Sequence, residues 1–269
     1  MTLPNTRHLL LSQDAGVLNV TFNRPQARNA MSLAMLAEIE AVFDAIVGRR
    51  DVRAVTLRGA GGHFCAGGDM KEMLASGQQA PASGQTDPVV VYSRAFGTML
   101  RRVEAAPQVV IAVCEGAVLG GGFGLTCVSD VALAQVDARF GLPETTRGLP
   151  PAQIAPFVVR RIGLTQARRL CLTGAQFDGH RAAALGLVHE TFTNQAELND
   201  KLGTLVDQIR RCAPDANAMT KQIILSTARM DMDQVLDLAA HKFAAAVRGA
   251  EAPEGIQAFL QKRKPSWAA

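Results

Sequence analysis

Two periods of hydrophobic and polar positions follow one another along the first half of the chain. Segments 17–22, 52–59 and 108–116 are short and rich in β-branched residues, which predicts strands. A segment that begins with a suitable helix cap at Ser32, and the segment 89–105, repeat apolar residues every three to four positions and predict helices. This alternation of strand and helix indicates the α/β class.

Helices dominate the second half of the chain. Strands are expected over 131–141, where an extended piece follows the strand, and over 186–192. Helical periodicity appears at 152–162, 164–172, 195–212, 215–229 and 231–247. We therefore expect a helical region beyond about residue 195 that caps the first region or packs against other subunits. The small, polar and proline-containing segment 75–88 predicts a mobile surface loop.

Composition limits the class of protein. A chain of 269 residues with 48% hydrophobic residues can form one large domain, or one domain with an appendage. Its longest apolar runs are too short for a membrane span, and its N-terminal apolar patch is too short for a signal peptide. Five widely spaced cysteines without a CxxC pair favour reduced thiols in the cytoplasm over disulfides or a zinc site, so no metal is expected.

The charge balance is basic. A net charge of +4 and a pI near 9.0, with arginines in pairs, suit a polyanionic partner such as nucleic acid or a phosphate-rich cofactor. One Tyr and one Trp are too few for base-stacking platforms, which makes nucleic acid the weaker candidate.

Two glycine-rich turns follow two of the expected strands. They lie at 61–73 and 118–125, and each opens into a helix whose first N–H groups are free. Two such turns that face each other can hold one developing oxyanion, and glycine permits the close backbone approach that this needs. Neither turn matches the dinucleotide or phosphate-loop fingerprints.

These turns also carry a family resemblance. The segments HFCAGGDMKEM, VLGGGFGLTCVSDVALA and FGLPETTRGLPP, in this order, resemble the crotonase (enoyl-CoA hydratase/isomerase) superfamily. The resemblance implies a spiral of ββα units over residues 1–194 and a helical trimerisation region over 195–269, hence a trimer or a hexamer. It places the oxyanion donors on the N–H groups of Gly68 and Gly121. Coenzyme A would be part of the acyl-CoA substrate, so no separate cofactor is expected, and its phosphates suit the basic balance.

The acid/base pair of the family is half missing. Two-carboxylate hydratases place one Glu two residues after the glycine triplet and another in FGxPE; this chain keeps Glu144 but has Gly124 at the first position. We expect desolvation to raise the pKa of Glu144, so that this carboxyl transfers protons alone. Gly124 is expected to leave space for a branch or an extra carboxylate on the acyl chain.

The resemblance also assigns binding residues. It places Arg28, Ala30, Ala66 and Gly67 along the CoA groove, with Asp69 and Met70 beside the substrate. Lys262 is expected to reach the adenine end, from a neighbouring subunit if the groove is shared.

One further residue is assigned from its spacing. Arg147 would lie one turn after Glu144, where it can orient a substrate carboxylate or form a structural salt bridge.

The expected activity is hydration of an α,β-unsaturated thioester. PAQIAPFV and the glycine at position 124 resemble bacterial hydratases of branched glutaconyl-CoA, both the isohexenylglutaconyl type of acyclic terpene (citronellol/geraniol) breakdown and the 3-methylglutaconyl type of leucine breakdown. RPQARNAMSLAM and the intact VLGGGFGL favour the isohexenyl type. Double-bond isomerisation and retro-Claisen cleavage are the enzymatic alternatives. Binding of AU-rich RNA, or sensing of acyl-CoA, is the alternative without catalysis.

Overall fold

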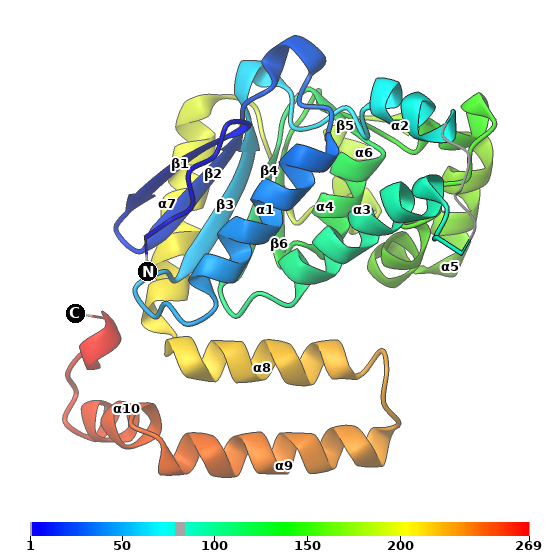
Figure 1. The fold of residues 1–269 in the computed structure, drawn as a ribbon. Helices are drawn as coiled ribbons and strands as arrows, with labels where there is room; N and C mark the ends of the chain where they lie inside the picture. Colours follow the sequence, from blue (N-terminus) through cyan, green and yellow to red (C-terminus); the bar gives the residue numbers. More distant parts are fainter. Residues whose placement is uncertain (1, 79–83, 269) are drawn as a thin grey trace.

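A six-stranded sheet forms the centre of the molecule in the computed structural model, which describes residues 2–78 and 84–268 (Figure 1). Its order is β1(Leu9–Asp14), β2(Val17–Phe22), β3(Ala54–Gly59), β4(Val109–Cys114), β6(Val131–Gln135) and β9(Glu190–Phe192). β1 is antiparallel to β2, and the remaining neighbours are parallel. The α/β class predicted from the sequence is confirmed.

Helices cover both faces of this sheet. α1(Leu33–Ile46) and α3(Pro88–Glu104) pack side by side and bury their apolar residues in the main core. The Oγ of Ser32 accepts the N–H of Met35, which confirms the expected cap of α1. On the other face, α7(Gln195–Arg211) buries Ile209 against strands β2, β3 and β4 (Figure 1).

A second, smaller sheet lies beside the six-stranded sheet. Its three strands are β5(Ala117–Leu119), β7(Arg139–Gly141) and β8(Gln176–Phe177). The helices of this region, with the short 3-10 helices η1, η2 and η3, are α2(Met70–Gly77), α4(Gly121–Val128), α5(Ala155–Thr173), α6(Gly179–Ala184), η1(Pro25–Ala27), η2(Ala60–Gly62) and η3(Pro143–Arg147). Gly163, at φ +76°, kinks α5 and separates the two helices that the sequence predicts there.

The chain ends in helices that project from the body. α8(Pro214–Ser226), α9(Met232–Arg248) and α10(Glu251–Leu260) lie below the sheet in Figure 1 and are followed by η4(Ser266–Ala268). The helical region starts at Gln195, close to the predicted residue 195, but α7 packs on the sheet, so the part that projects from the body begins at Pro214. Lys221 of α8 pairs with Asp130 at 2.6 Å and ties this region to the body.

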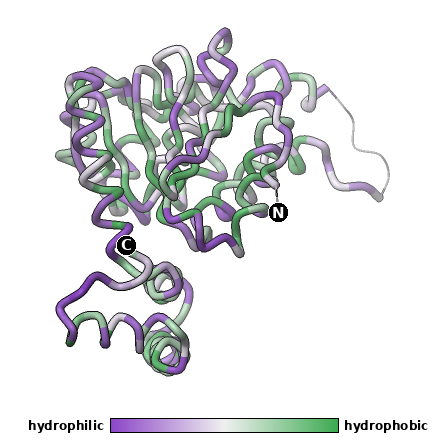
Figure 2. Tube along the Cα trace, turned by 90° about the vertical axis from the view of Figure 1, so that its left-hand side faces the viewer, coloured by the Kyte–Doolittle hydropathy of each residue, from purple (hydrophilic) through white to green (hydrophobic). Residues whose placement is uncertain are grey.

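The projecting helices expose large apolar side chains. Figure 2 shows apolar positions among polar ones along this part of the chain. Those exposed by more than half are Ile224, Met232, Leu236, Phe243, Ile256, Phe259 and Leu260. An isolated copy of the chain would expose these apolar side chains to water. Exposed apolar surfaces of this kind mark interaction sites.

Some sequence predictions differ from the structure. The strand expected over 186–192 is restricted to its last three residues, β9, because a turn precedes it. α2 continues to Gly77, so the expected loop 75–88 starts later, and its residues 79–83 lie outside the described residues. β1 and α10 were not predicted. Within the described ranges, no helix is both long and apolar enough to cross a membrane.

Candidate active site

The two glycine-rich turns are in direct contact. Backbone pairing joins them, because the N–H of Cys65 donates to Ala117 O and the N–H of Leu119 donates to Cys65 O, both at 2.9 Å. A methyl group added to Gly120 would lie 3.4 Å from the Cα of Gly67, and both glycines have a positive φ. Side chains at either position would therefore strain the backbone and separate the turns.

Each turn offers a backbone N–H group without an acceptor. The N–H of Asp69 donates to Met31 O and the N–H of Met31 donates to Gly67 O, which leaves the N–H of Gly68 between them. Gly121 is the first residue of α4, and its N–H is one of the free groups of a helix start. Among the described residues, neither N–H has a hydrogen-bond acceptor.

The two glycines also share one neighbour, the ring of Phe96. A methyl group on Gly68 would lie 3.1 Å from Phe96 Cζ, and one on Gly121 would lie 3.6 Å from Phe96 Cε1. Two free N–H groups beside one aromatic ring can hold a single oxygen in surroundings of low polarity. The two N–H groups are therefore candidates for the donors of an oxyanion hole.

Glu144 lies against the second turn. It belongs to η3, and its Oε1 would be 2.8 Å from a methyl group added to Gly120. Its Oε2 is buried and has no hydrogen-bond partner among the described residues. Burial raises the pKa of the Glu144 carboxyl above its usual value, and its own backbone N–H and the charge of Arg147 oppose this rise. An unpaired carboxyl with a raised pKa is suited to proton transfer.

A cavity of about 900 Å³ joins these groups. It contains most of the residues that the sequence assigned to the site: Ala30, Ala66, Gly67, Gly68, Asp69, Met70, Gly121, Glu144 and Arg147. Three assigned residues, Arg28, Gly124 and Lys262, are not among those that line it.

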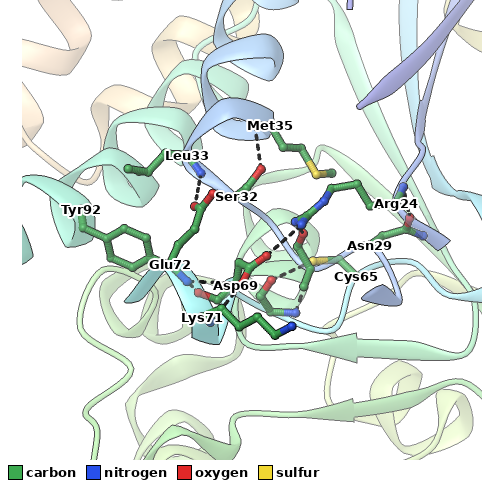
Figure 3. A network of polar contacts seen from close by, with 12 residues as sticks. Arg24, Asn29, Ser32, Leu33, Met35, Cys65, Asp69, Lys71, Glu72 and Tyr92 are labelled. Atoms are coloured by element: carbon green, nitrogen blue, oxygen red, sulfur yellow. Dashed lines mark hydrogen bonds and ion pairs between the residues drawn. The ribbon is translucent and has the colours of Figure 1, made fainter. Parts of the chain in front are cut away.

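Arg24 takes the place expected for Arg28. The backbone of Arg28 adopts φ +49° and its carbonyl accepts the N–H of Ala66 at 3.0 Å, while its side chain is exposed. Arg24 lines the cavity and donates to Asp69 Oδ2 at 2.8 Å and to the carbonyl of Ala30 (Figure 3). Asp69 in turn accepts the N–H of Lys71 and caps α2. This pair is a fixed part of the wall rather than a free charge.

Gly124 is buried behind the cavity wall. A methyl group on Gly124 would lie 3.2 Å from Leu100 Cδ1 and 3.3 Å from Ile154 Cγ2, and Ile154 lines the cavity. The space that the glycine provides is therefore filled by apolar side chains of this chain. The contact joins α4 to the residue before α5, and no local sequence pattern could have revealed it.

Lys262 lies just after α10, which ends at Leu260. In the described part of the chain it does not line the cavity.

The comparisons with known proteins agree with this geometry. The family model described as enoyl-CoA hydratase/isomerase matches residues 12–269. The chain belongs to this family. A crystal structure of an enoyl-CoA hydratase/isomerase from Marinobacter aquaeolei is 52% identical, covers 97% of this chain and 99% of its own, and superposes with a TM-score of 0.94.

Other relatives extend over the whole chain as well. The structure of Pseudomonas aeruginosa AtuE is 56% identical, with a TM-score of 0.93 and coverage of 98% of this chain and 100% of that one. The 2,3-dehydroadipyl-CoA hydratase of Escherichia coli is 30% identical over 260 residues, which is 96% of this chain and 98% of the relative. The expected crotonase fold, a spiral core followed by helices, is thus confirmed.

Other chemistry finds less support in this region. Cys65 is fully buried, and burial raises the pKa of its thiol to about 12, so it is a poor nucleophile. Within the described residues, no three His, Cys, Asp or Glu side chains are grouped closely enough to hold a metal ion.

Proposed function

We propose that this protein is an enoyl-CoA hydratase that adds water across the double bond of an α,β-unsaturated acyl-CoA. Coenzyme A enters as part of the substrate, and the reaction uses no further cofactor. The observation that carries the proposal is the meeting, in one cavity, of two backbone N–H groups without acceptors and the unpaired carboxyl of Glu144.

The reaction can be written with these groups alone. The N–H groups of Gly68 and Gly121 hold the thioester oxygen, which gains negative charge as the enolate forms. Ionised Glu144 takes a proton from water while the water oxygen bonds to the β-carbon. The protonated Glu144 then gives the same proton to the α-carbon, the enolate collapses to the thioester, and the carboxylate is restored. One carboxyl therefore suffices, because it acts first as base and then as acid.

Double-bond isomerisation is the second candidate. The same carboxyl can remove a proton from the γ-carbon and return it to the α-carbon, and the family includes both reactions by its description. Hydration is favoured because several of the matching relatives are named hydratases and one is named an isomerase.

For the acyl group, we propose a branched glutaconyl chain, with isohexenylglutaconyl-CoA as first choice and 3-methylglutaconyl-CoA as the alternative. The cavity of about 900 Å³ is at the upper end for small-molecule sites, and its wall includes the apolar residues Leu149, Pro150 and Ile154. These features suit a bulky acyl chain. The choice between the branched chains depends on the resemblance of short segments.

The rest of the ligand would follow the glycine side of the cavity. Ala30, Ala66 and Gly67 leave room for the pantetheine arm, and Lys71 offers a cation for a phosphate. We propose that α8 to α10 assemble copies into a trimer or a pair of trimers, which would let Lys262 of a neighbouring copy reach the adenine end. Free cysteines at all five positions suit a reducing compartment such as the cytoplasm.

The test is hydration by the wild type and by Glu144→Gln, followed by loss of enoyl-thioester absorbance and by product mass. We expect a loss of about a thousandfold or more, because general acid–base groups contribute roughly 10²–10⁴ and no second group replaces this one. Binding of a saturated acyl-CoA should persist. Glu72→Gln is the matched control, since Glu72 holds the N–H of Leu33 outside the cavity (Figure 3) and should keep turnover within a few fold. Near-normal turnover by folded Glu144→Gln would refute the assignment.

A further inference from the structure

We propose that Arg147 binds a carboxylate on the acyl chain and so selects acid-bearing enoyl thioesters over neutral ones of the same length. The inference rests on the proposed function, since it assumes that an acyl-CoA occupies the cavity.

The position of Arg147 follows from the short helix that carries Glu144. η3 has three residues per turn and rises about 2 Å per residue, so residue 147 lies on the same side as residue 144, about 6 Å along the axis. Gly148 ends the helix at φ +75°, and the N–H of Leu149 returns to Glu144 O at 3.1 Å. Both side chains line the cavity, and the charge of Arg147 acts on the Glu144 carboxyl.

Arg147 is free to take a ligand. Three cationic side chains line the cavity: Arg24, Lys71 and Arg147. Arg24 is paired with Asp69. The Lys71 ammonium also has no partner among the described residues, but it belongs to α2 and not to the short helix that carries Glu144. Within the described residues, the Arg147 side chain has neither a hydrogen bond nor an ion pair, although it is three residues from a carboxylate on which its charge acts. Its neighbours along the wall, Leu149 and Pro150, offer it no charge.

A substrate that carries a carboxylate needs such a cation in the site, because its negative charge would lie close to the ionised Glu144. In a glutaconyl thioester the carboxylate is two bonds from the β-carbon, where Glu144 must act as an anion. Two carboxylates so close repel each other, unless a cation between them offsets the repulsion. A guanidinium can also hold a carboxylate through two parallel hydrogen bonds. Apolar side chains surround Gly124, so no second protein carboxylate lies at this position to compete with the substrate for Arg147.

The test compares glutaconyl-CoA with its monomethyl ester, which keeps the chain but loses the charge. We expect the wild type to favour the acid in kcat/KM by about tenfold to a hundredfold, the range of a hydrogen-bonded charge pair. In Arg147→Gln this ratio, measured on the pH plateau of each enzyme, should fall to near one, because turnover of the acid falls more than turnover of the ester. Arg147 is exposed and unpaired, so this variant should fold.

Lys71→Gln is the matched control, because it removes another cation that lines the same cavity. It should lower kcat/KM for both thioesters by a similar factor and leave their ratio unchanged. An unchanged ratio in Arg147→Gln, or a ratio that follows Lys71 instead, would overturn the proposal.

Binding separates this inference from the proposed function. If neither thioester is hydrated, the proposed function fails, but glutaryl-CoA and valeryl-CoA still report on Arg147 through their dissociation constants. Preference for glutaryl-CoA in the wild type, lost in Arg147→Gln, would support carboxylate binding without hydration. Equal affinities for the two ligands in the wild type would refute it.

Discussion

Substitution of Gly124 tests whether the missing second carboxylate has been replaced by apolar packing. A methyl group at this position meets Leu100 Cδ1 at 3.2 Å and Ile154 Cγ2 at 3.3 Å, so its neighbours must yield by a few tenths of an ångström. Replacing a helical glycine by alanine gains about 1 kcal/mol in helix propensity, which offsets mild overpacking of about 1 kcal/mol. Gly124→Ala should therefore be within about 1 kcal/mol of the wild type.

Gly124→Glu should behave differently. The longer side chain must displace both neighbours, at a cost of about 1–3 kcal/mol, and it buries a carboxyl without a partner, at a further cost of about 1–3 kcal/mol. The sum, about 2–6 kcal/mol, corresponds to a fall in Tm on the order of 5–20 °C at fixed protein concentration. Adding Ile154→Ala removes the side chain that fills this space, and should recover part of the loss by letting the new carboxyl reach the cavity.

The assay combines calorimetry with kcat/KM for glutaconyl-CoA and for crotonyl-CoA. The ratio of the two constants compares transition-state stabilisation and cancels general damage to folding. In Gly124→Glu/Ile154→Ala, the second carboxylate should lower turnover of the acid-bearing substrate more than that of crotonyl-CoA. A Gly124→Glu protein as stable as the wild type, with an unchanged ratio, would refute the packing account.

Three further predictions concern the site and the assembly. Gly120→Ala should reduce kcat at least a hundredfold, because its backbone has φ +50° and the added methyl would lie 2.8 Å from Glu144 Oε1; Gly203→Ala, at an open helix position, is the control. In the pH profile of kcat/KM, activity should fall as pH drops through the raised pKa of Glu144, so the acidic limb should lie above pH 4.5. Arg147→Gln should move that limb to higher pH, since the Arg147 charge lowers this pKa; a limb at or below 4.5 would show that Glu144 is not the titrating base. Phe243→Glu with Phe259→Glu should shift the sedimentation of the protein from trimer or hexamer towards monomer, because both rings are exposed on the projecting helices at 73% and 82%; a wild type that sediments only as a monomer at micromolar concentration would contradict the assembly.

Local pattern was sufficient for the elements that form the core. β3 and β4 are runs of buried apolar residues, and their sequences alone indicate strands. β1 was not predicted, because its sequence LLLSQD does not alternate between apolar and polar residues. It is an edge strand in which Leu9 is buried but Leu10 is exposed. α10 contains Pro and Gly, which lower helix propensity, and it buries little of its surface, so nothing local marked it.

The site shows the same division between local and long-range information. The glycine turns and Glu144 stand in recognisable motifs, and the structure brings them together. Which arginine of 24–28 enters the cavity depends on the left-handed backbone at Arg28 and on the partner Asp69, forty-five residues further along the chain. The role of Ile154 over Gly124 depends on how α4 packs near α5. No periodic pattern in the sequence predicts either contact, so only the folded structure reveals them.

The most direct test of the proposed hydration is the reaction run in water labelled with ¹⁸O and, separately, in D₂O. If water adds across the double bond, the product should be a 3-hydroxyacyl-CoA that carries one ¹⁸O on the β-carbon and one deuterium on the α-carbon, and Glu144→Gln should form neither. A product with a shifted double bond and without ¹⁸O, whether or not it carries deuterium, would contradict hydration and assign the site to isomerisation.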